Sequence, residues 1–314
     1  MLESAEIVLQ PLRSRLYDRF RVDVSVLRLD TIHPLLSGNK WFKLRPALEQ
    51  ALKLRCPILS FGGAWSNHIH ALAYAGFQSG VETVGIIRGE PEYATNAMLS
   101  DARRWGMRLQ FVDRNTYRLR DREEYRHQLS LAHGGALVVP EGGTTSAAVH
   151  SVSEIWQLPV MREQGADLLL TAVGSGGTLA GLVAGKPEGT RVLGVPVLKC
   201  GSEMVSRVNA LLGSAGYAGS SGWELLEGAH RGGYARLDAE LAAMIEHVGK
   251  IHRLPLDPVY TAKLVMAFNR LLLAGQVVAG SKVVLVHTGG LQGVRGHQAR
   301  LSALAPAFSG PLAV

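Results

Sequence analysis

Short apolar or β-branched runs alternate with amphipathic segments over most of this chain. The runs have the length of strands, whereas the segments between them repeat apolar residues at helical spacing. Such alternation predicts parallel sheets covered by helices on both faces, so the expected fold class is α/β. The expected strands span residues 24–29, 57–61, 82–87, 108–112, 137–139, 168–173, 191–197 and 282–287. Expected helices include 41–54, 68–78, 93–105 and 258–274, and the Gly- and Ser-rich segment 201–230 is either a loop or an irregular helix pair.

Composition excludes several classes of protein. At 314 residues the chain exceeds what one minimal core needs, which favours two domains. The formal net charge is +7, but basic and acidic residues alternate in stretches such as 113–126, as on a solvated helix face, so we expect no nucleic-acid partner. Without a bilayer-length apolar stretch or a signal-peptide pattern, we expect a cytoplasmic protein with no membrane contact. Cys56 and Cys200 are expected to be buried, reduced thiols.

Three of the expected strands end in glycine-rich turns that open helices. These turns are residues 62–67, 174–178 and 287–290. In open α/β sheets, ligands bind at the carboxyl ends of strands, where free backbone N–H groups and the helix dipole attract anions. Three such turns indicate a ligand with more than one anionic group.

The turn at 174–178 has the composition of a phosphate site. Its backbone amides and the hydroxyls of Ser175 and Thr178 could surround one phosphate group. A dinucleotide fingerprint would need glycine at position 179, which is leucine, and the Gly-Lys-Ser/Thr of a Walker loop is absent. A turn that serves only tight packing is the alternative. The residues of the expected phosphate site are Gly174, Ser175, Gly176, Gly177 and Thr178.

In the turn at 62–67, the amides that open the next helix could hold a carboxylate while the Ser66 hydroxyl faces the reacting carbon. N-cap residues of the helix are the alternative role for Ser66 and Asn67. The histidines at 68, 70 and 287 show no metal-ligand spacing with a nearby carboxylate, so we interpret them as satisfied or solvated and expect no metal.

Lys40 follows a Gly-Asn turn directly and precedes a helix-periodic segment, within the run Ser37-Gly38-Asn39-Lys40-Trp41-Phe42-Lys43-Leu44. An amine held on a rigid element and deprotonated by its surroundings can form a Schiff base with a carbonyl. The alternative is a solvated lysine in the first helical turn. Tyr260 lies at the start of the expected helix at 258–274, where a core role is the alternative, and Tyr234 lies on a loop.

These motifs occur in a characteristic order: Ser37-Gly38-Asn39-Lys40-x-x-Lys43-Leu44, Gly62-Gly63-x-x-Ser66-Asn67, Gly174-Ser175-Gly176-Gly177-Thr178, Leu256-Asp257-Pro258-Val259-Tyr260-Thr261-x-Lys263 and His287-Thr288-Gly289-Gly290. Over residues 24–293 the chain resembles the 1-aminocyclopropane-1-carboxylate deaminase and D-cysteine desulfhydrase family. The members are pyridoxal-phosphate enzymes of fold type II, with a tryptophan synthase β-like fold of two three-layer domains. Five motifs in the right order make chance a poor explanation.

The resemblance implies a role for each turn. Lys40 would bind pyridoxal 5'-phosphate covalently through an imine, Asn67 would bond its ring hydroxyl, and the loop at 174–178 would hold its phosphate. Ser66 with neighbouring amides would take the substrate carboxylate. Tyr260 and Tyr234 match two tyrosines that contact the substrate.

Two positions depart from the deaminase pattern. Where the deaminase subgroup has a glutamate after the tyrosine, this chain has Thr261, as the desulfhydrase subgroup does. A hydroxyl leaves the ring nitrogen closer to neutral, which β-elimination tolerates better than cyclopropane ring opening. The sequence around Tyr234 also differs from the usual family run, so the shape of the substrate is expected to differ.

We therefore expect a large cofactor-binding domain of residues 1–52 and 151–314 and an inserted small domain of residues 53–150. The expected activity is deaminating β-elimination from a small amino acid, most similar to that of D-cysteine desulfhydrase, by a homodimer. The alternatives are 1-aminocyclopropane-1-carboxylate deamination, a lyase of the same fold with another amino-acid substrate, and a sensor that binds a phosphate-bearing ligand without chemistry.

Overall fold

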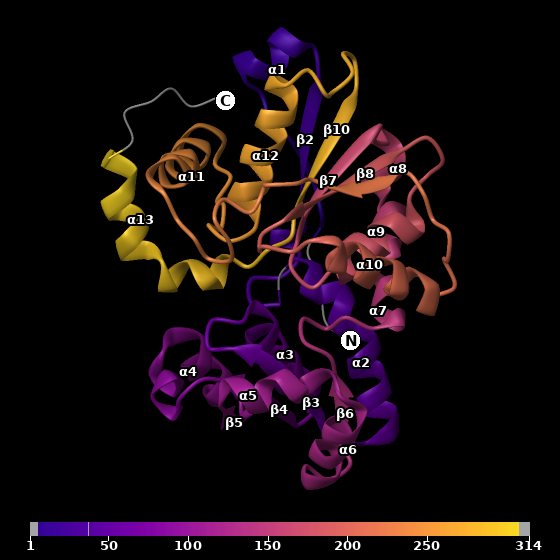
Figure 1. Cartoon of the computed structure of the whole chain (residues 1–314), viewed down its shortest axis with the longest axis vertical. Helices are drawn as coiled ribbons and strands as arrows, with labels where there is room; N and C mark the ends of the chain where they lie inside the picture. The colour runs from indigo at the N-terminus through magenta and orange to yellow at the C-terminus, as the bar shows by residue number, and fades with distance from the viewer. Residues whose placement is uncertain (1–5, 37, 308–314) are drawn as a thin grey trace.

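The computed structural model describes residues 6–36 and 38–307 and contains two mostly parallel sheets (Figure 1). Ser37, the first residue of the lysine motif, lies outside the described residues. In the larger sheet the strand order is β1-β2-β10-β7-β8-β9, and only β1 runs antiparallel to its neighbour. The strands are β1 (Leu9–Pro11), β2 (Asp23–Arg28), β10 (Lys282–His287), β7 (Leu168–Val173), β8 (Arg191–Pro196) and β9 (Trp223–Leu225).

The smaller sheet is parallel throughout and has the order β5-β4-β3-β6. Its strands are β5 (Arg108–Val112), β4 (Thr83–Arg88), β3 (Ile58–Gly63) and β6 (Leu137–Val139). The helices of the chain are α1 (Arg15–Phe20), α2 (Asn39–Leu54), α3 (Asn67–Ser79), α4 (Ala97–Arg104), α5 (Arg114–Tyr117), α6 (Glu123–Ala132), α7 (Ser146–Ser153), α8 (Pro159–Gln164), α9 (Gly177–Gly185), α10 (Ser202–Ser214), α11 (Ala239–His252), α12 (Thr261–Leu273) and α13 (Gln298–Leu304).

Each sheet lies between two layers of helices, because successive strand residues face opposite sides. In β7, Leu168 and Leu170 contact the core formed with α11 and α12, whereas Leu169 and Val173 contact the core formed with α7, α9 and α10. The smaller sheet has α3 and α4 on one face and α5 and α6 on the other. Buried on both sides, β7 is apolar almost throughout, as parallel central strands are.

The expected α/β fold class is confirmed, and all eight expected strands are present within a residue or two of their expected ends. The expected helix at 93–105 is instead a 3-10 turn, Pro91–Thr95, followed by α4, because the Asn96 side chain accepts hydrogen bonds from the amides of Met98 and Leu99 and starts a new helix. Segment 201–230 contains α10 and the edge strand β9.

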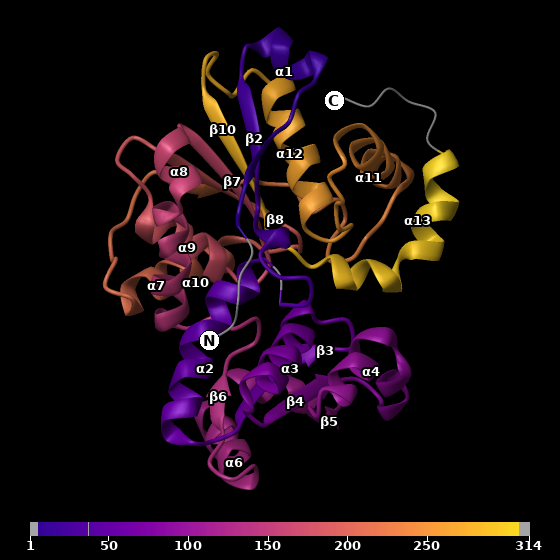
Figure 2. The ribbon, with the colours of Figure 1, turned by 180° about the vertical axis from the view of Figure 1, so that it is seen from behind.

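The smaller sheet uses strands between Ile58 and Val139 only. The exact domain boundaries at 52/53 and 150/151 stay a prediction. In Figures 1 and 2 the smaller unit lies below the larger one, α2 reaches from one to the other, and α13 lies beside α11 at the edge of the larger unit. Because α2 carries Lys40 at its start, the lysine lies between the two units.

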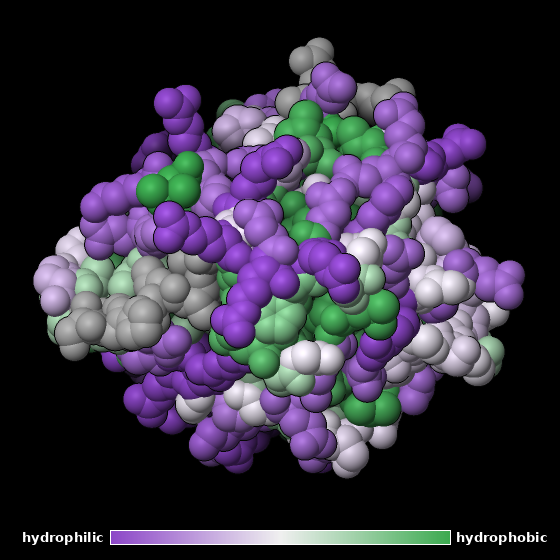
Figure 3. Space-filling view, turned by 90° about the horizontal axis from the view of Figure 1, so that it is seen from above, coloured by the Kyte–Doolittle hydropathy of each residue, from purple (hydrophilic) through white to green (hydrophobic). Residues whose placement is uncertain are grey.

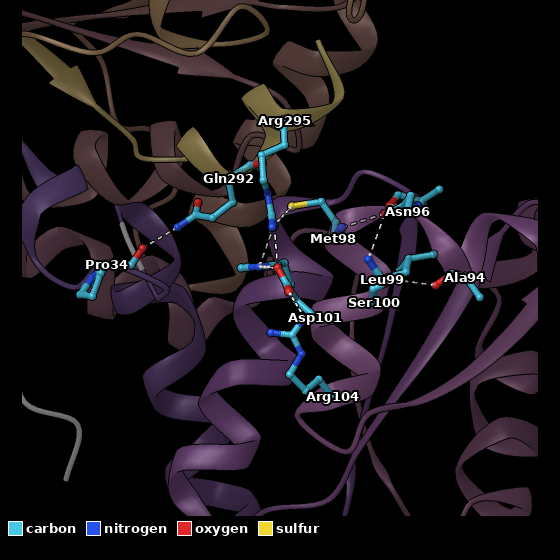
Figure 4. Close-up of polar contacts among 12 residues, drawn as sticks. Pro34, Ala94, Asn96, Met98, Leu99, Ser100, Asp101, Arg104, Gln292 and Arg295 are labelled. Atoms are coloured by element: carbon cyan, nitrogen blue, oxygen red, sulfur yellow. Dashed lines mark hydrogen bonds and ion pairs between the residues drawn. The ribbon is translucent and has the colours of Figure 1, made fainter. Parts of the chain in front are cut away.

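A polar contact joins the two units beside the cleft. The Arg295 guanidinium, in the 3-10 turn Leu291–Gly296 after β10, donates to the Asp101 carboxylate of α4 at 2.7 Å (Figure 4). Asp101 also accepts from His70 of α3 at 3.3 Å and pairs with Arg104 at 3.3 Å. The cluster of His70, Asp101, Arg104 and Arg295 thus connects the smaller unit to the segment that follows β10.

The end of the molecule seen from above shows apolar side chains among charged ones (Figure 3). Exposed apolar residues occur at the end of α12 and in the connection to β10, where Leu273 and Val278 lie. No helix in the described part of the chain is long and apolar enough to cross a membrane. Cys56 and Cys200 are free thiols, as expected, but they are only partly buried, whereas full burial was expected.

Candidate active site

A cavity of about 680 Å³ lies between the two units at the carboxyl ends of β3, β7 and β10. The turns that follow these strands contribute Gly63, Gly174 and Thr288 to its wall. The three glycine-rich turns expected from the sequence therefore meet in one place, as the general rule for open α/β sheets predicts.

Lys40 lies in the first turn of α2, at the head of this cavity. Gly38, the residue before the helix, has a φ of 68°, and a Cβ added to it would lie 1.9 Å from the Thr288 carbonyl oxygen. Only glycine fits this close approach, which fixes the start of α2 against the end of β10. The Asn39 amide donates to the same carbonyl at 3.2 Å.

The Lys40 Nζ atom donates to Asn39 Oδ1 at 2.9 Å, and Asn39 Nδ2 donates in turn to Thr178 Oγ1 at 2.7 Å. Burial lowers the pKa of Lys40 to about 8, and the Asp257 charge acts in the opposite direction. At pH 7 about one Lys40 in ten therefore carries a neutral amine, roughly 300-fold more than an ordinary lysine. Lys40 is partly buried and lines the cavity, and its role as the coenzyme lysine stays a prediction.

At the turn after β3, Ser66 is the N-cap of α3, and its hydroxyl accepts from the Ile69 amide at 3.3 Å. Asn67 is the first helical residue, and its Oδ1 atom is buried without a hydrogen-bond partner among the described residues. Its Nδ2 atom lies 2.7 Å from the position that a Cβ of Gly290 would take. An orphaned amide oxygen that lines a cavity needs a donor from a bound group.

The turn after β7 has the backbone geometry to bind an anion. Gly176 has a φ of 88° and caps α9, so the amides that start this helix are free to bind. Lys43, one turn after Lys40 on α2, has only 2% of its surface exposed and donates to Thr144 Oγ1 at 3.0 Å and Ser175 Oγ at 3.3 Å. No carboxylate lies within ion-pair distance of Lys43 in the described residues.

A buried ammonium without a carboxylate is costly unless an anion binds beside it. Burial lowers the pKa of Lys43 well below its usual range, and the neighbouring Lys40 adds to this effect. A phosphate group at the Gly174–Thr178 turn would supply the missing negative charge. Lys43 is the functional candidate that the sequence interpretation missed, although its spacing of three residues from Lys40 places both on one helix face.

Tyr260 and Tyr234 lie together on the opposite wall of the cavity, with their hydroxyl oxygens 3.5 Å apart and their rings edge to face. The Tyr260 ring packs against Gly174 of the phosphate turn. Burial raises the pKa of both hydroxyls, so both are protonated at neutral pH. The Asp257 carboxylate accepts from the amide of Tyr260 and from that of Thr261, which fixes the start of α12.

Two of the expected site residues do not line the cavity. Thr261 is buried, and its hydroxyl accepts from the Asp257 amide at 2.7 Å. Gly177 lies behind the wall, where an added Cβ would come within 3.0 Å of Lys43 Nζ. The cavity is lined by all the remaining expected residues, namely Lys40, Ser66, Asn67, Gly174, Ser175, Gly176, Thr178, Tyr234 and Tyr260.

His68 also lines the cavity, and it is neither solvated nor fully satisfied, the two alternatives expected from the sequence. The Ser60 hydroxyl donates to the Val139 carbonyl at 2.7 Å, so it must accept from His68 Nε2, also at 2.7 Å. The Nδ1 atom is then a buried acceptor with no partner among the described residues. Within the same residues, no group of three or more His, Cys, Asp or Glu side chains could hold a metal ion.

Comparisons with known proteins agree with this geometry. Residues 11–289 match the sequence profile of a family described as pyridoxal-phosphate dependent enzymes. This chain belongs to that family. A Pyrococcus furiosus protein provisionally named 1-aminocyclopropane-1-carboxylate deaminase is 31% identical over 293 residues, which cover 86% of this chain and 85% of that protein. The fold-type-II enzyme is thus a member of the 1-aminocyclopropane-1-carboxylate deaminase and D-cysteine desulfhydrase family.

Two further comparisons support the assignment. The D-cysteine desulfhydrase of Klebsiella pneumoniae is 23% identical to this pyridoxal-phosphate enzyme, over 88% of this chain and 89% of that one. A crystal structure of a homologue of 1-aminocyclopropane-1-carboxylate deaminase superposes with a TM-score of 0.84 at 26% identity, covering 97% of this chain and 95% of the other. The buried Lys43, the orphaned Asn67 oxygen and the Lys40 amine could hold the phosphate, the ring hydroxyl and the aldehyde of this coenzyme.

Proposed function

We propose that this enzyme catalyses deaminating β-elimination from a small amino acid, in the manner of D-cysteine desulfhydrase. The observation that carries the proposal is the position of Lys40, whose amine has a pKa of about 8 between a carboxylate-binding turn and a phosphate-binding turn. D-Cysteine would give pyruvate, ammonia and sulfide. A homodimer in the cytoplasm stays our prediction for the assembly and its location.

Different residues would hold the coenzyme and remove the substrate Cα proton. Lys43, Ser175 and the amides that start α9 would hold the coenzyme phosphate, and Asn67 would bond the ring hydroxyl. When bound, the coenzyme supplies an aldehyde for imine formation and a conjugated ring that stabilises negative charge at the substrate Cα atom. Lys40 would take the Cα proton, because its amine titrates close to neutral pH.

The substrate is positioned by both walls of the cleft. Ser66 and the free amides of the β3–α3 turn would bind the α-carboxylate. The hydroxyls of Tyr234 and Tyr260 face the other side and are protonated, so they can donate to the departing group.

The deaminase activity is the second candidate, because the Pyrococcus furiosus relative carries that name. Against it, the residue after Tyr260 is Thr261, where the deaminase subgroup has a glutamate. The carboxylates that line the cavity are Glu141 and Glu203, and Glu141 is already bound by Arg120 and Tyr117. Glu203 belongs to the first turn of α10, so neither of these carboxylates takes the place of the glutamate that follows the tyrosine in the deaminase subgroup.

The test is a product assay with D-cysteine, L-cysteine and 1-aminocyclopropane-1-carboxylate. We expect pyruvate and sulfide from a cysteine enantiomer, and loss of this activity in Lys40→Ala by at least about 1,000-fold, since a covalent and proton-transferring group is removed. Lys53→Ala, an exposed lysine at the end of the same helix, is the matched control. Normal turnover by Lys40→Ala would refute the mechanism, and 2-oxobutanoate as the main product would establish the deaminase instead.

A further inference from the structure

A buried ammonium that no step of the proposed reaction uses holds the loop of Tyr234. Lys263, in the first turn of α12, has none of its surface exposed. Its Nζ atom donates to the carbonyl oxygens of Gly233 at 2.7 Å, His230 at 2.9 Å and Val197 at 3.3 Å. These three contacts use every hydrogen of the ammonium, so the backbone satisfies the group completely.

The ligands of this ammonium are neutral. In the part of the chain that the structure describes, no carboxylate lies within ion-pair distance of Lys263. Burial lowers the pKa of Lys263 to about 8, and the charge of Asp257 acts in the opposite direction, so about nine in ten of these side chains are charged at pH 7. A single positive charge among backbone carbonyl oxygens is also the arrangement with which proteins bind bare potassium ions.

The loop that supplies two of these carbonyls has a strained backbone. Arg231 and Ala235 have φ values of 49° and 54°, in the left-handed region that is unfavourable for residues other than glycine. Gly232 and Gly233, which lie between them, also have a positive φ. With this backbone the carbonyls of His230 and Gly233 point at the ammonium, and such a conformation persists only where its surroundings hold it.

The same ammonium lies behind two walls of the active site. Two of its carbonyl ligands directly precede residues that line the cavity, Tyr234 in the loop and Leu198 after β8. The helix of Lys263 begins directly after Tyr260, whose hydroxyl oxygen lies 3.5 Å from that of Tyr234. A positive charge at this position therefore fixes the two tyrosines relative to each other.

We propose that the Lys263 ammonium takes the place of a bound monovalent cation and positions the tyrosine pair without one. The wild-type enzyme should then need no alkali ion. Removing the ammonium while keeping its carbonyl ligands would create a site for potassium or for free ammonium, which are similar in charge and size. The cation site goes beyond the proposed function, and only the activity assay below rests on that function.

The first test measures the Tm of the coenzyme-loaded Lys263→Ser and Lys263→Met proteins in choline chloride and in potassium chloride of equal ionic strength. The serine side chain lacks the ammonium and the two methylene groups next to it, which leaves room for an ion, whereas methionine fills the space. Potassium should raise the Tm of Lys263→Ser by at least about 3 °C, because it binds the folded state only, and should leave Lys263→Met unchanged. Lys282→Ser removes an exposed lysine that donates to one carbonyl, and this matched control should show no shift.

The second test measures kcat/KM of Lys263→Ser with the better cysteine enantiomer in the same salts. In choline chloride we expect a value at least about 10-fold below that of the wild type, and a recovery of at least about 5-fold in potassium or ammonium chloride. Lithium, a much smaller ion, should restore little, and Lys263→Met should stay low in every salt. A side chain that only filled space would give no such order of ions.

Equal Tm values of Lys263→Ser in choline and potassium would overturn the inference, and so would the same potassium effect in Lys263→Met or Lys282→Ser. A wild type that needs potassium, or a Lys263→Ser protein that is unfolded in every salt, would overturn it as well, since the ammonium and the ion would then not be interchangeable. Stabilisation by potassium without recovery of turnover would refute the positioning of the tyrosines. If the wild type turned over neither cysteine enantiomer, the proposed function would fail, while the Tm series would still decide on the cation site.

Discussion

Replacing Lys263 with methionine tests how the Tyr234 loop is held in the active site. Lys263 lies in the first turn of α12 with none of its surface exposed, and its Nζ atom donates to the carbonyls of Gly233 at 2.7 Å, His230 at 2.9 Å and Val197 at 3.3 Å. These contacts tie the loop that carries Tyr234 to the helix that begins beside Tyr260.

The expected cost follows from two opposing contributions. Three hydrogen bonds from an ammonium are worth together about 4.5–9 kcal/mol. Burial lowers the pKa of Lys263 to about 8. That shift corresponds to about 3 kcal/mol of desolvation cost for the charged form, which methionine would not incur. We therefore expect Lys263→Met to lower the free energy of unfolding by about 2–5 kcal/mol and the Tm by roughly 5–15 °C.

The assay is urea unfolding of both proteins, at pH 7 and at pH 9.5. Because the folded-state pKa lies below the unfolded value, the unfolded chain binds more protons between about pH 8 and pH 10.4, and the contribution of Lys263 to stability rises with pH over this window. The difference between wild type and variant should widen accordingly. Lys282→Met is the control, since the exposed Lys282 ammonium donates to one carbonyl only, at 3.2 Å. A Lys263→Met variant within about 0.5 kcal/mol of the wild type would refute the reasoning.

Two further predictions concern the coenzyme end of the site. Gly38→Ala should lower the free energy of unfolding by more than about 3 kcal/mol, because it combines a positive φ with a collision against Thr288. Gly106→Ala is the control, since Gly106 has a φ of 84° and open space around it, and should cost about 1 kcal/mol. Equal costs in thermal unfolding would contradict this account. Asn67→Ala should weaken pyridoxal-phosphate binding about 10-fold in a fluorescence titration of the unloaded protein, and an unchanged affinity would show that the orphaned oxygen has no role in holding the ring.

The sequence was most informative where local pattern and motif coincide. Strands such as β7 and β10 are continuous apolar runs followed by glycine-rich turns, so both the strand and its ligand-binding end could be predicted. The three-residue strands β1 and β9 were missed, because such short edge strands depend on pairing with β2 and β8 and have almost no pattern of their own.

The roles of the charged side chains in the site were harder to predict, because their surroundings depend on contacts between segments that are distant in the sequence. Lys43 was assigned no role, since its burial arises only when Thr144 and Ser175 pack beside it. Arg88 of the cavity wall belongs to β4, whose sequence shows only a strand that ends in arginine. The Thr261 hydroxyl accepts from the Asp257 amide, a contact that the sequence did not indicate, and its role at the coenzyme ring stays a prediction.

The place of β10 between β2 and β7 determines when the active site can exist during synthesis. Lys40 lies at the start of α2, yet the Gly38 turn that positions it packs against Thr288, which follows β10. Until β10 has been synthesised and has joined the sheet, the start of α2 lacks this contact, and the Lys40 amine is not held beside the Gly174–Thr178 turn. We therefore expect pyridoxal phosphate to bind the folded protein, after β10 has joined the sheet.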